Sequence, residues 1–250
     1  MSAPWPAFAE AIARRAGAGR PPVFWWRDDD ATAPAPELQH LLELAYSSAV
    51  PLALAVVPDG AQPELFELLR GDVGVLQHGA DHRNRAAAGE KKTEFPRSEA
   101  DHEAIGRLAR ARERLVSLAG ARALPVLAPP WNRLRAELVE KLPQAGIRGL
   151  SAYGGKVSAV KGVTQVNTHV DIVAWGAGKR FMGEQPALEL AQRYLEDRTE
   201  ALRDHAEPLG WLTHHAVHEA DALDFLRRLF EISRRAGARW ASIRQLWPAP

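Results

Sequence analysis

The sequence predicts an α/β fold built on a parallel sheet, and three observations favour this class. Short apolar runs alternate with helical stretches from one end of the chain to the other, as in repeated strand–helix–strand units. The length of 250 residues is typical of a (β/α) barrel domain. The chain contains no internal repeat, no heptad pattern and no Gly/Ser linker. We therefore expect a single domain that covers residues 1–250.

The predicted strands are short apolar runs separated by helical stretches. They cover residues 23–26, 51–57, 73–76, 125–128, 147–151, 164–170, 210–213 and 239–243. Helical stretches with an apolar side cover residues 105–119, 186–205 and 219–235. Residues 80–96 form the longest polar and irregular stretch, which we interpret as a functional loop rather than a domain boundary.

The composition excludes several classes of protein. Hydrophobic residues make up 46% of the chain and charged residues 25%, as in an ordinary globular protein. The formal net charge of +1 gives no electrostatic reason to expect nucleic acid or an anionic membrane as a partner. Because the chain has no cysteine, disulfides, thiolate zinc sites and a cysteine nucleophile are excluded.

The N-terminal segment lacks the pattern of a targeting signal. No basic start leads into an apolar run, and Glu10 lies within the segment. No stretch approaches the roughly 18 apolar residues that a membrane helix requires. The sequence therefore predicts a cytoplasmic protein with no membrane insertion, and it leaves the oligomeric state open.

Three consecutive carboxylates follow the first predicted strand. Residues 23–26 run into Arg27, Asp28, Asp29 and Asp30, at the kind of strand end where parallel α/β folds place functional groups. Adjacent carboxylates are costly beside an apolar strand unless a cation compensates them. The run is either a solvated turn that caps a helix or a metal site next to a general base.

A second candidate site follows the third predicted strand. His78 and His82 are four residues apart, so both rings can face one metal ion on a helical turn or across a tight loop. Two surface histidines explain this spacing equally well. The carboxylate run at another strand end favours a metal, because two histidines and one carboxylate form a common open catalytic site.

The fourth predicted strand ends in a stiff aromatic segment. Pro129 and Pro130 force an extended backbone, and Trp131 follows them. The segment is either only a rigid loop or a fixed rim, with an aromatic wall for a sugar ring. In the second case the backbone N–H of Trp131 is a candidate oxyanion donor.

Histidines concentrate on or just after the predicted strands. Five of the nine lie there: His78, His82, His169, His214 and His215. Strand side chains alternate between faces, so His214 and His215 cannot both point into one site if the strand is regular there, and Leu212 shares a face with His214. The alternative is that both are structural, with His218 in the pocket.

In order along the chain, these segments resemble the five motifs of the polysaccharide deacetylase family, carbohydrate esterase family 4, whose domain is the NodB-homology domain. The matching segments are Asp29-Asp30, His78 to His82, Pro129-Pro130-Trp131, Asp171 and Leu212-Thr213-His214. The resemblance covers roughly residues 23–247. It implies a distorted (β/α) barrel of about seven parallel strands.

The resemblance also implies an activity. It indicates a metal-dependent hydrolase, acting on a carbon–nitrogen bond other than a peptide bond, that removes an acyl group, in particular N-acetyl, from a sugar or glycan precursor. Histidine and carboxylate ligands suit zinc best here, with cobalt, nickel and manganese as alternatives. A metal-dependent barrel hydrolase of another C–N or ester bond, and a non-catalytic sugar-binding relic, remain open.

The family's motifs assign roles to residues of this chain. The metal ligands are Asp30, His78 and His82; the general base is Asp29; the general acid is His214, oriented by Asp171; and the candidate substrate contacts are Trp131, Arg133 and Trp175.

Two departures from the family pattern affect the base. Where the family has Thr or Ser followed by Phe, this chain has Arg27 and Asp28, so the pair of base and ligand is either Asp29/Asp30 or Asp28/Asp29. The third motif lacks its arginine, because Ala128 stands there. Arg27 and Arg133 are the candidates to supply the missing positive charge.

Overall fold

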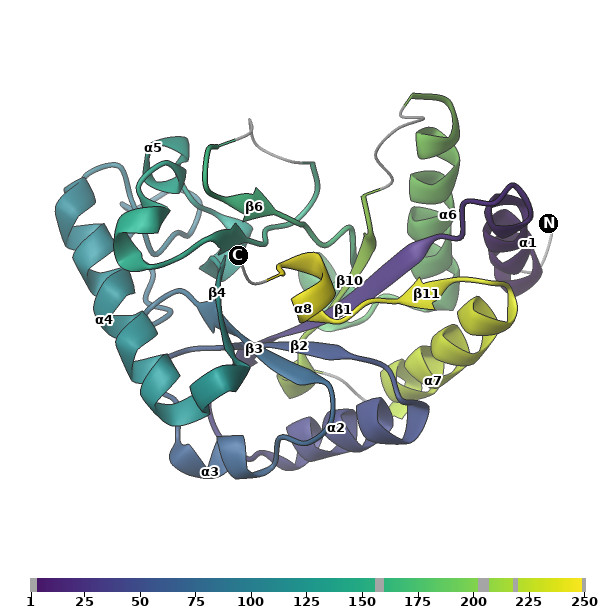
Figure 1. Ribbon diagram of the computed structural model, residues 1–250, viewed down its shortest axis with the longest axis horizontal. Coiled ribbons are helices and arrows are strands. Elements are labelled where there is room, and N and C mark those ends of the chain that lie inside the picture. Colours follow the sequence, from purple (N-terminus) through teal and green to yellow (C-terminus); the bar gives the residue numbers. More distant parts are fainter. Residues whose placement is uncertain (1–3, 156–159, 202–206, 218–219, 249–250) are drawn as a thin grey trace.

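The computed structural model describes residues 4–155, 160–201, 207–217 and 220–248, and its main feature is one curled parallel sheet with helices on its outer side (Figure 1). The sheet has nine strands in the order β6-β5-β4-β3-β2-β1-β10-β7, with β11 beside β1. The strands are β1 (Val23–Ala31), β2 (Leu52–Val56), β3 (Val73–His78), β4 (Ala123–Ala128), β5 (Gly149–Leu150), β6 (Thr164–Gln165), β7 (Val170–Asp171), β10 (Leu209–Thr213) and β11 (Arg239–Trp240). The expected distorted (β/α) barrel is thus confirmed, with several strands reduced to two residues.

Helices cover the outer face of this sheet, and one short helix lies inside its curve (Figure 1). The helices are α1 (Pro4–Gly17), α2 (Pro36–Ser48), α3 (Pro63–Glu67), α4 (Asp101–Ala119), α5 (Ala136–Val139), α6 (Glu184–Ala201), α7 (Ala220–Arg235) and α8 (Ile243–Leu246). Strands β8 (Val173–Ala174) and β9 (Arg180–Phe181) form a separate antiparallel pair. In the described part of the chain, no helix is both long and apolar enough to cross a membrane.

Strand β1 divides its side chains between two buried layers. Phe24 and Trp26 pack in the outer core with residues of α1, α2, α6 and α7. Trp25 packs in the inner core, where Trp247 after α8 meets its ring edge-on at 5.6 Å. Because side chains alternate along a strand, Arg27 and Asp29 continue the inner face and Asp28 continues the outer one.

The inner layer is closed at one end by α8, and this closure depends on a small residue. A Cβ atom at Gly74 of β3 would lie 1.9 Å from Cδ1 of Ile243, so only glycine lets the helix approach the sheet this closely. The described chain therefore fills the amino-terminal end of the barrel with side chains and leaves the carboxyl ends of the strands for polar groups.

Strand β1 is longer than the sequence suggested, and this corrects one interpretation. Arg27, Asp28 and Asp29 do not form a solvated turn; they lie within the strand and are 0%, 0% and 2% exposed. The pairing of β1 with β2 on one side and β10 on the other extends the strand through this polar run. Asp30 interrupts the pairing with β2, since its φ of 73° coincides with a register shift between Asp28 and Ala31.

Most other predicted elements are confirmed with shifted ends. The helix predicted over 105–119 begins earlier, at Asp101, and the predicted strand 164–170 is split into β6 and β7. The helix predicted over 186–205 corresponds to α6, and its predicted end lies outside the described residues. Residues 80–96 contain no helix or strand, as expected for a loop.

Candidate active site

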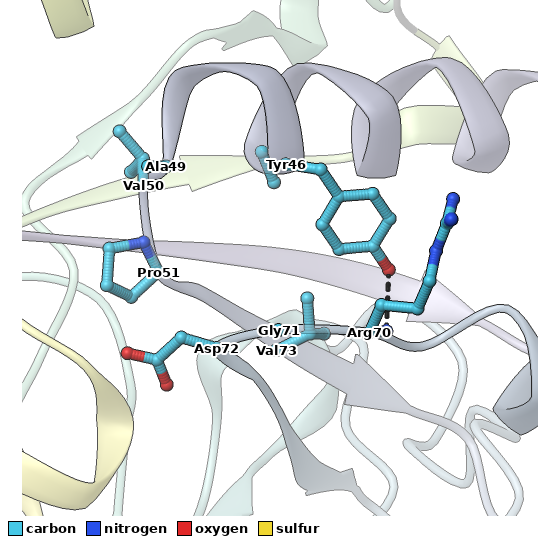
Figure 2. A pocket seen from close by; sticks show the side chains of 9 residues that line it. Tyr46, Ala49, Val50, Pro51, Arg70, Gly71, Asp72 and Val73 are labelled. Carbon is cyan, nitrogen blue, oxygen red and sulfur yellow. Dashed lines mark hydrogen bonds between the residues drawn. The ribbon is translucent and has the colours of Figure 1, made fainter.

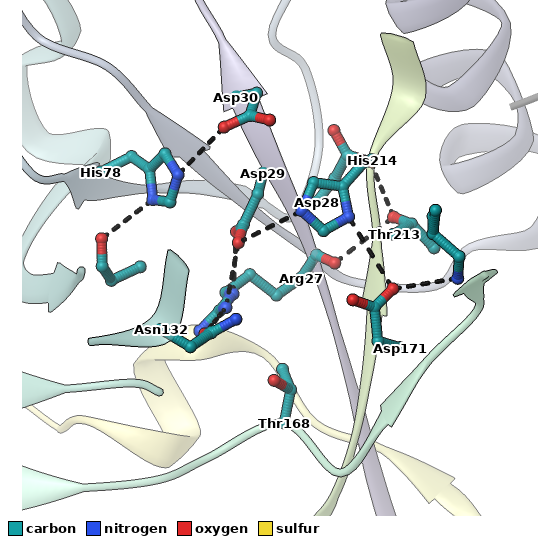
Figure 3. Close-up of polar contacts among 12 residues, drawn as sticks. Arg27, Asp28, Asp29, Asp30, His78, Asn132, Thr168, Asp171, Thr213 and His214 are labelled. Atoms are coloured by element: carbon teal, nitrogen blue, oxygen red, sulfur yellow. Dashed lines mark hydrogen bonds and ion pairs between the residues drawn. The ribbon is translucent and has the colours of Figure 1, made fainter. Parts of the chain in front are cut away.

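The polar residues singled out in the sequence meet at the carboxyl ends of β1, β3, β7 and β10 (Figure 3). Asp29 and Asp30 come from β1, His78 ends β3, Asp171 ends β7, and His214 follows β10. Parallel strands bring their carboxyl ends to one edge, so residues distant in sequence share one opening. This edge therefore contains three distinct groups: a possible metal site, a carboxylate held by an arginine, and a histidine between two carboxylates.

The first group is a cluster of one carboxylate and two imidazoles. Oδ1 of Asp30 lies 3.1 Å from Nε2 of His78 and 3.2 Å from Nε2 of His82. Two ligand atoms that each lie 2.0–2.1 Å from one tetrahedral ion are about 3.3 Å apart. All three ligand atoms fall within 4.8 Å of one another, so Asp30, His78 and His82 could hold one metal ion.

The tautomer of His78 supports the same conclusion. Its Nδ1 lies 2.9 Å from the carbonyl oxygen of Ala128, so Nδ1 carries a proton and donates it there. A neutral ring then presents the lone pair of Nε2 to Asp30, which is the arrangement of a metal ligand fixed by a backbone carbonyl. Nε2 of His78 and the carboxylate of Asp30 are then both acceptors, so a proton or a cation must lie between them. A divalent metal ion would satisfy both groups.

The contacts between Asp30 and the two histidines also shift the pKa values of Asp30 and His78. Burial alone would raise the pKa of Asp30, but hydrogen bonds from His78 and His82 outweigh it and hold the pKa well below its usual range. Burial alone would lower the pKa of His78, yet the charges of Asp29 and Asp30 raise it above its ordinary value. The site thus favours positive charge at its centre, whether a proton or a metal supplies it.

Backbone strain concentrates around this cluster. Asp30, His82, Trp131 and Asn132 are four of the six non-glycine residues with positive φ in the described part of the chain, with φ between 55° and 73°. Such conformations cost of order 1–3 kcal/mol each and persist where the surrounding structure imposes them. Their concentration at one edge indicates a site that is held in a fixed geometry.

A carboxylate that the sequence did not reveal holds the turn between the two histidines. Oε1 of Glu94 accepts hydrogen bonds from the backbone N–H groups of Ala80, at 2.9 Å, and Asp81, at 3.2 Å. Glu94 is fully buried, and this burial raises its pKa. A Cβ atom at Gly79, where φ is +64°, would lie 2.0 Å from Oε2 of Glu94. Nε of Arg107 lies 3.7 Å from the same Oε1 of Glu94. These partners are 13 or 14 residues away in the sequence, so no local pattern marked Glu94.

Arg27 holds the second group, the carboxylate of Asp29. Its Nε and Nη2 lie 2.8 Å and 3.0 Å from the two carboxylate oxygens, which is a bidentate pair. Nη2 also donates to Oδ1 of Asn132 at 2.7 Å, and Nη1 donates to Oγ and O of Ser151 at 2.7 Å and 2.9 Å. Arg27 and Asp29 both lie on the inner face of β1. The strand itself therefore supplies a positive charge beside Asp29, where the third motif has Ala128 in place of an arginine.

His214 forms the third group and lies between two carboxylates (Figure 3). Its Nε2 is 3.9 Å from Oδ2 of Asp29, and its Nδ1 is 3.9 Å from Oδ1 of Asp171. Asp171 is held in place by hydrogen bonds from the backbone N–H of Val173, at 3.0 Å, and Nε1 of Trp175, at 2.7 Å. Burial raises the pKa of Asp171 despite the attraction of His214. This ring can exchange a proton with a group bound beside Asp29.

The remaining histidines lie elsewhere. His215 begins the short 3-10 turn after β10, where its Nδ1 is 2.5 Å from Oδ2 of Asp28. His169 accepts a hydrogen bond from the N–H of Gly210, at 3.1 Å, and its ring packs against that of Tyr194. His218 lies outside the described residues.

Two indoles flank the opening. The ring centroid of Trp131 lies 4.6 Å from that of His82, on the side of the cluster of Asp30, His78 and His82. Trp175 is 46% exposed and meets the ring of His214 edge-on at 4.7 Å. Arg133 lies further out, where it donates to the carbonyl oxygen of Lys92, so it does not replace the missing arginine.

A groove at the other end of the sheet lacks comparable chemistry (Figure 2). It encloses about 440 Å³ near the start of β2 and β3, and Tyr46, Arg70 and Asp72 are its polar side chains. The guanidinium of Arg70 lies 5.0 Å from the centre of the Tyr46 ring. This groove contains one carboxylate and no histidine, so it does not offer a hydrolytic site.

Comparison with known proteins identifies the fold. No family model matches the sequence, and no curated protein resembles it closely enough to count as a match. A peptidoglycan N-acetylglucosamine deacetylase superposes with a TM-score of 0.60 at 14% identity, covering 92% of this chain and 89% of its own. The chitin deacetylase of Colletotrichum lindemuthianum gives a TM-score of 0.57 at 16% identity over 91% and 88%.

A third similar structure is named as an esterase rather than as a deacetylase. The family 4 acetyl xylan esterase from Clostridium thermocellum, described in complex with a cobalt ion, gives a TM-score of 0.56 at 12% identity over 90% of each chain. The expected resemblance is therefore confirmed at the level of fold: this chain has the NodB-type distorted barrel of the family 4 carbohydrate esterases.

Proposed function

We propose that the protein is a metal-dependent hydrolase that removes an acyl group, in particular N-acetyl, from a sugar or glycan precursor. The observation that carries this proposal is the meeting, at one edge of the barrel, of the Asp30, His78 and His82 cluster with Asp29 and His214. The same fold carries deacetylation in proteins named for that activity, which supports the choice among hydrolytic reactions.

Asp30, His78 and His82 would hold the divalent ion, for which zinc is the first candidate and cobalt, nickel and manganese are alternatives. When bound, such an ion lowers the pKa of a coordinated water and polarises the acyl oxygen. The chain's part is to keep His78 in the required tautomer through Ala128 and to hold His82 in its strained turn through Glu94.

Asp29 is the proposed general base. Its carboxylate faces the opening from the strand position before Asp30, so it lies beside the ligand cluster. The two contacts with Arg27 hold both of its oxygens in place. Asp29 therefore accepts a proton from the attacking water. Asp28 is unsuited to this role because it faces the helical layer, so the geometry favours Asp29 and Asp30 as base and ligand.

His214 is the proposed general acid. It lies close to Asp29, on the side of the opening away from the metal cluster, where a leaving amine would depart. Asp171 faces its Nδ1 and orients the ring so that Nε2 points into the site. The proton passes from Nε2 of His214 to the leaving nitrogen as the C–N bond breaks.

Trp131, Arg133 and Trp175 are the proposed substrate contacts. The two indoles border the opening on opposite sides, which suits a sugar ring that stacks against one of them. The backbone N–H of Trp131 is the proposed donor to the developing oxyanion. We further propose that the protein acts in the cytoplasm on a soluble or lipid-linked precursor.

A metal-reloading assay tests the function. The purified protein is stripped with a chelator, reloaded with one metal at a time, and incubated with acetylated amino sugars and with O-acetylated sugars. We expect acetate release from the N-acetyl substrates, loss of turnover in the stripped protein and recovery on reloading. Release from O-acetyl substrates alone would favour an esterase. Binding of sugar without acetate release from either set, with metal bound, would contradict a hydrolytic function.

A further inference from the structure

The run of three carboxylates contains one member that the proposed mechanism does not use. Asp29 and Asp30 face the opening, whereas Asp28 is fully buried on the outer face of β1, behind the site (Figure 3). A buried carboxylate is costly unless it is well paired. What Asp28 contacts therefore indicates why it stands there.

Asp28 binds the two residues on either side of His214. Its Oδ1 accepts hydrogen bonds from Oγ1 of Thr213, at 2.7 Å, and from the backbone N–H of His215, at 2.9 Å. Its Oδ2 lies 2.5 Å from Nδ1 of His215. Nε1 of Trp26 donates to Oγ1 of Thr213 at 2.9 Å, and the Thr213 hydroxyl has a second, longer acceptor in the carbonyl oxygen of Arg27, at 3.3 Å.

These contacts lie where the sheet no longer holds the chain. The last paired position between β1 and β10 is Asp28 with Thr213, so His214 and His215 lie beyond the ladder. Asp28 then ties the side chain of Thr213 and both the backbone N–H and the ring of His215 to β1, where β10 ends and a 3-10 turn begins at His215. Because both neighbours of His214 are held against Asp28, its backbone is held with the ring toward Asp29 and Asp171.

We propose that Asp28 is a positioning residue for the general acid, which it sets between Asp29 and Asp171 by clamping both neighbours of His214. This proposal rests on the proposed function only for the role of His214 as acid. The ring lies 3.9 Å from a carboxylate on each side, so a small rotation of the backbone at residue 214 would move Nε2 away from the reacting nitrogen. Misplacement by about 1 Å can cost about 10²-fold in rate.

The test compares two substrates that differ in their need for an acid. Hydrolysis of an N-acetyl sugar requires a proton on the leaving nitrogen, whereas 4-nitrophenyl acetate releases a stable anion without one. For Asp28→Ala we expect kcat on the amide to fall about 10- to 100-fold, within the range for a misplaced acid. On the ester, kcat stays within a factor of about three, and so does the zinc Kd.

Matched variants separate positioning from general damage. Thr213→Val keeps the shape of the side chain but removes its contact to Asp28 and the acceptor of the Trp26 N–H, and Thr213→Ser keeps the hydroxyl for both. We expect the amide defect in Thr213→Val and near wild-type turnover in Thr213→Ser. In an Asp28→Ala/His214→Ala double variant, kcat on the amide should be no lower than in His214→Ala alone. Full additivity of the two defects would overturn the proposal.

A readout without turnover keeps the proposal testable if the function itself is wrong. In the wild-type protein, nuclear Overhauser contacts should connect the rings of His214 and Trp175, which meet at 4.7 Å. We expect these contacts to weaken in Asp28→Ala and in Thr213→Val. If wild-type protein cleaves neither substrate, the proposed function fails, and these contacts still decide the positioning role. Unchanged contacts, or equal losses on both substrates, would refute it.

Discussion

Glu94 offers the sharpest test of how the chain shapes its proposed metal site. Its Oε1 accepts the N–H groups of Ala80 and Asp81, both of which lie between His78 and His82. In Glu94→Ala these two amides lose their acceptor, at about 1–3 kcal/mol for each one that stays buried. We therefore expect the free energy of unfolding to fall by about 2–6 kcal/mol. Mispositioned ligands should also weaken zinc binding about 10- to 100-fold.

Glu94→Gln separates shape from charge. Its amide oxygen can still accept both hydrogen bonds, so we expect most of the zinc affinity to remain. Burial raises the pKa of Glu94, so the folded state binds its proton more tightly than the unfolded state does. The contribution of Glu94 to stability is therefore greatest below its unfolded pKa and declines as the pH rises through the folded pKa. Across that window, the stability of Glu94→Gln relative to wild type should rise with pH.

The assays are zinc titration by competition with a chelator and chemical unfolding at a series of pH values. Glu90→Ala is the matched control, because Glu90 lies in the same loop but is exposed, where it accepts the N–H of Ala87 at 3.2 Å. We expect this control to match wild type in both measurements. If Glu94→Ala binds zinc as tightly as Glu90→Ala does, the turn keeps its shape without Glu94 and the reasoning is refuted.

Further predictions concern the other groups at the site and one ion pair outside it. His78→Ala should abolish the binding of one equivalent of metal, measured by elemental analysis, while the circular dichroism spectrum stays native. Arg27→Met removes the cation that pairs with the buried carboxylate of Asp29, so the free energy of unfolding should fall by about 3–5 kcal/mol and turnover should fall as well. A free energy of unfolding equal to that of wild type would contradict this. His214→Ala should retain metal and fold but lose about 10²–10⁴-fold in rate on the amide, and retained turnover would exclude it as the acid. Hydrogen bonds from Arg135 and Lys141 lower the pKa of Asp101 to about 2, so Asp101→Asn should lose stability relative to wild type above pH 4 and approach it as the pH falls towards 2, as measured by unfolding.

Side-chain periodicity made part of this structure predictable. His214 and His215 were expected to point in different directions, and the structure places His214 beside Asp29 and His215 beside Asp28, although β10 ends at Thr213 and His215 begins a 3-10 turn. Apolar runs likewise predicted the parallel sheet, because strands buried on both faces are continuously hydrophobic. The roles assigned to the site residues stay predictions, since position alone does not establish catalysis.

Contacts between segments that are distant in the sequence could not be predicted from local sequence patterns. The interpretation of Arg27, Asp28 and Asp29 as a possible solvated turn was wrong because pairing with β2 and β10 overrides the low strand preference of aspartate. Glu94 escaped notice because its partners, two backbone amides and Arg107, are 13 or 14 residues away in the sequence. Of the two arginines considered for the base, only the distances distinguish Arg27, which contacts Asp29, from Arg133, which contacts a loop carbonyl.

The polar end of β1 shows how one strand can organise a whole site. Alternation directs Arg27 and Asp29 inward and Asp28 outward, and the positive φ of Asp30 breaks the alternation so that a third carboxylate reaches the two histidines. A regular strand would have placed Asp30 on the same face as Asp28, in the helical layer. The strained residue is thus what allows two adjacent aspartates, the proposed base and the proposed metal ligand, to face the same opening. A substitution of Asp30 that restores regular pairing would therefore have two effects. It would remove one proposed metal ligand, and it would also shift the neighbouring residues of the site.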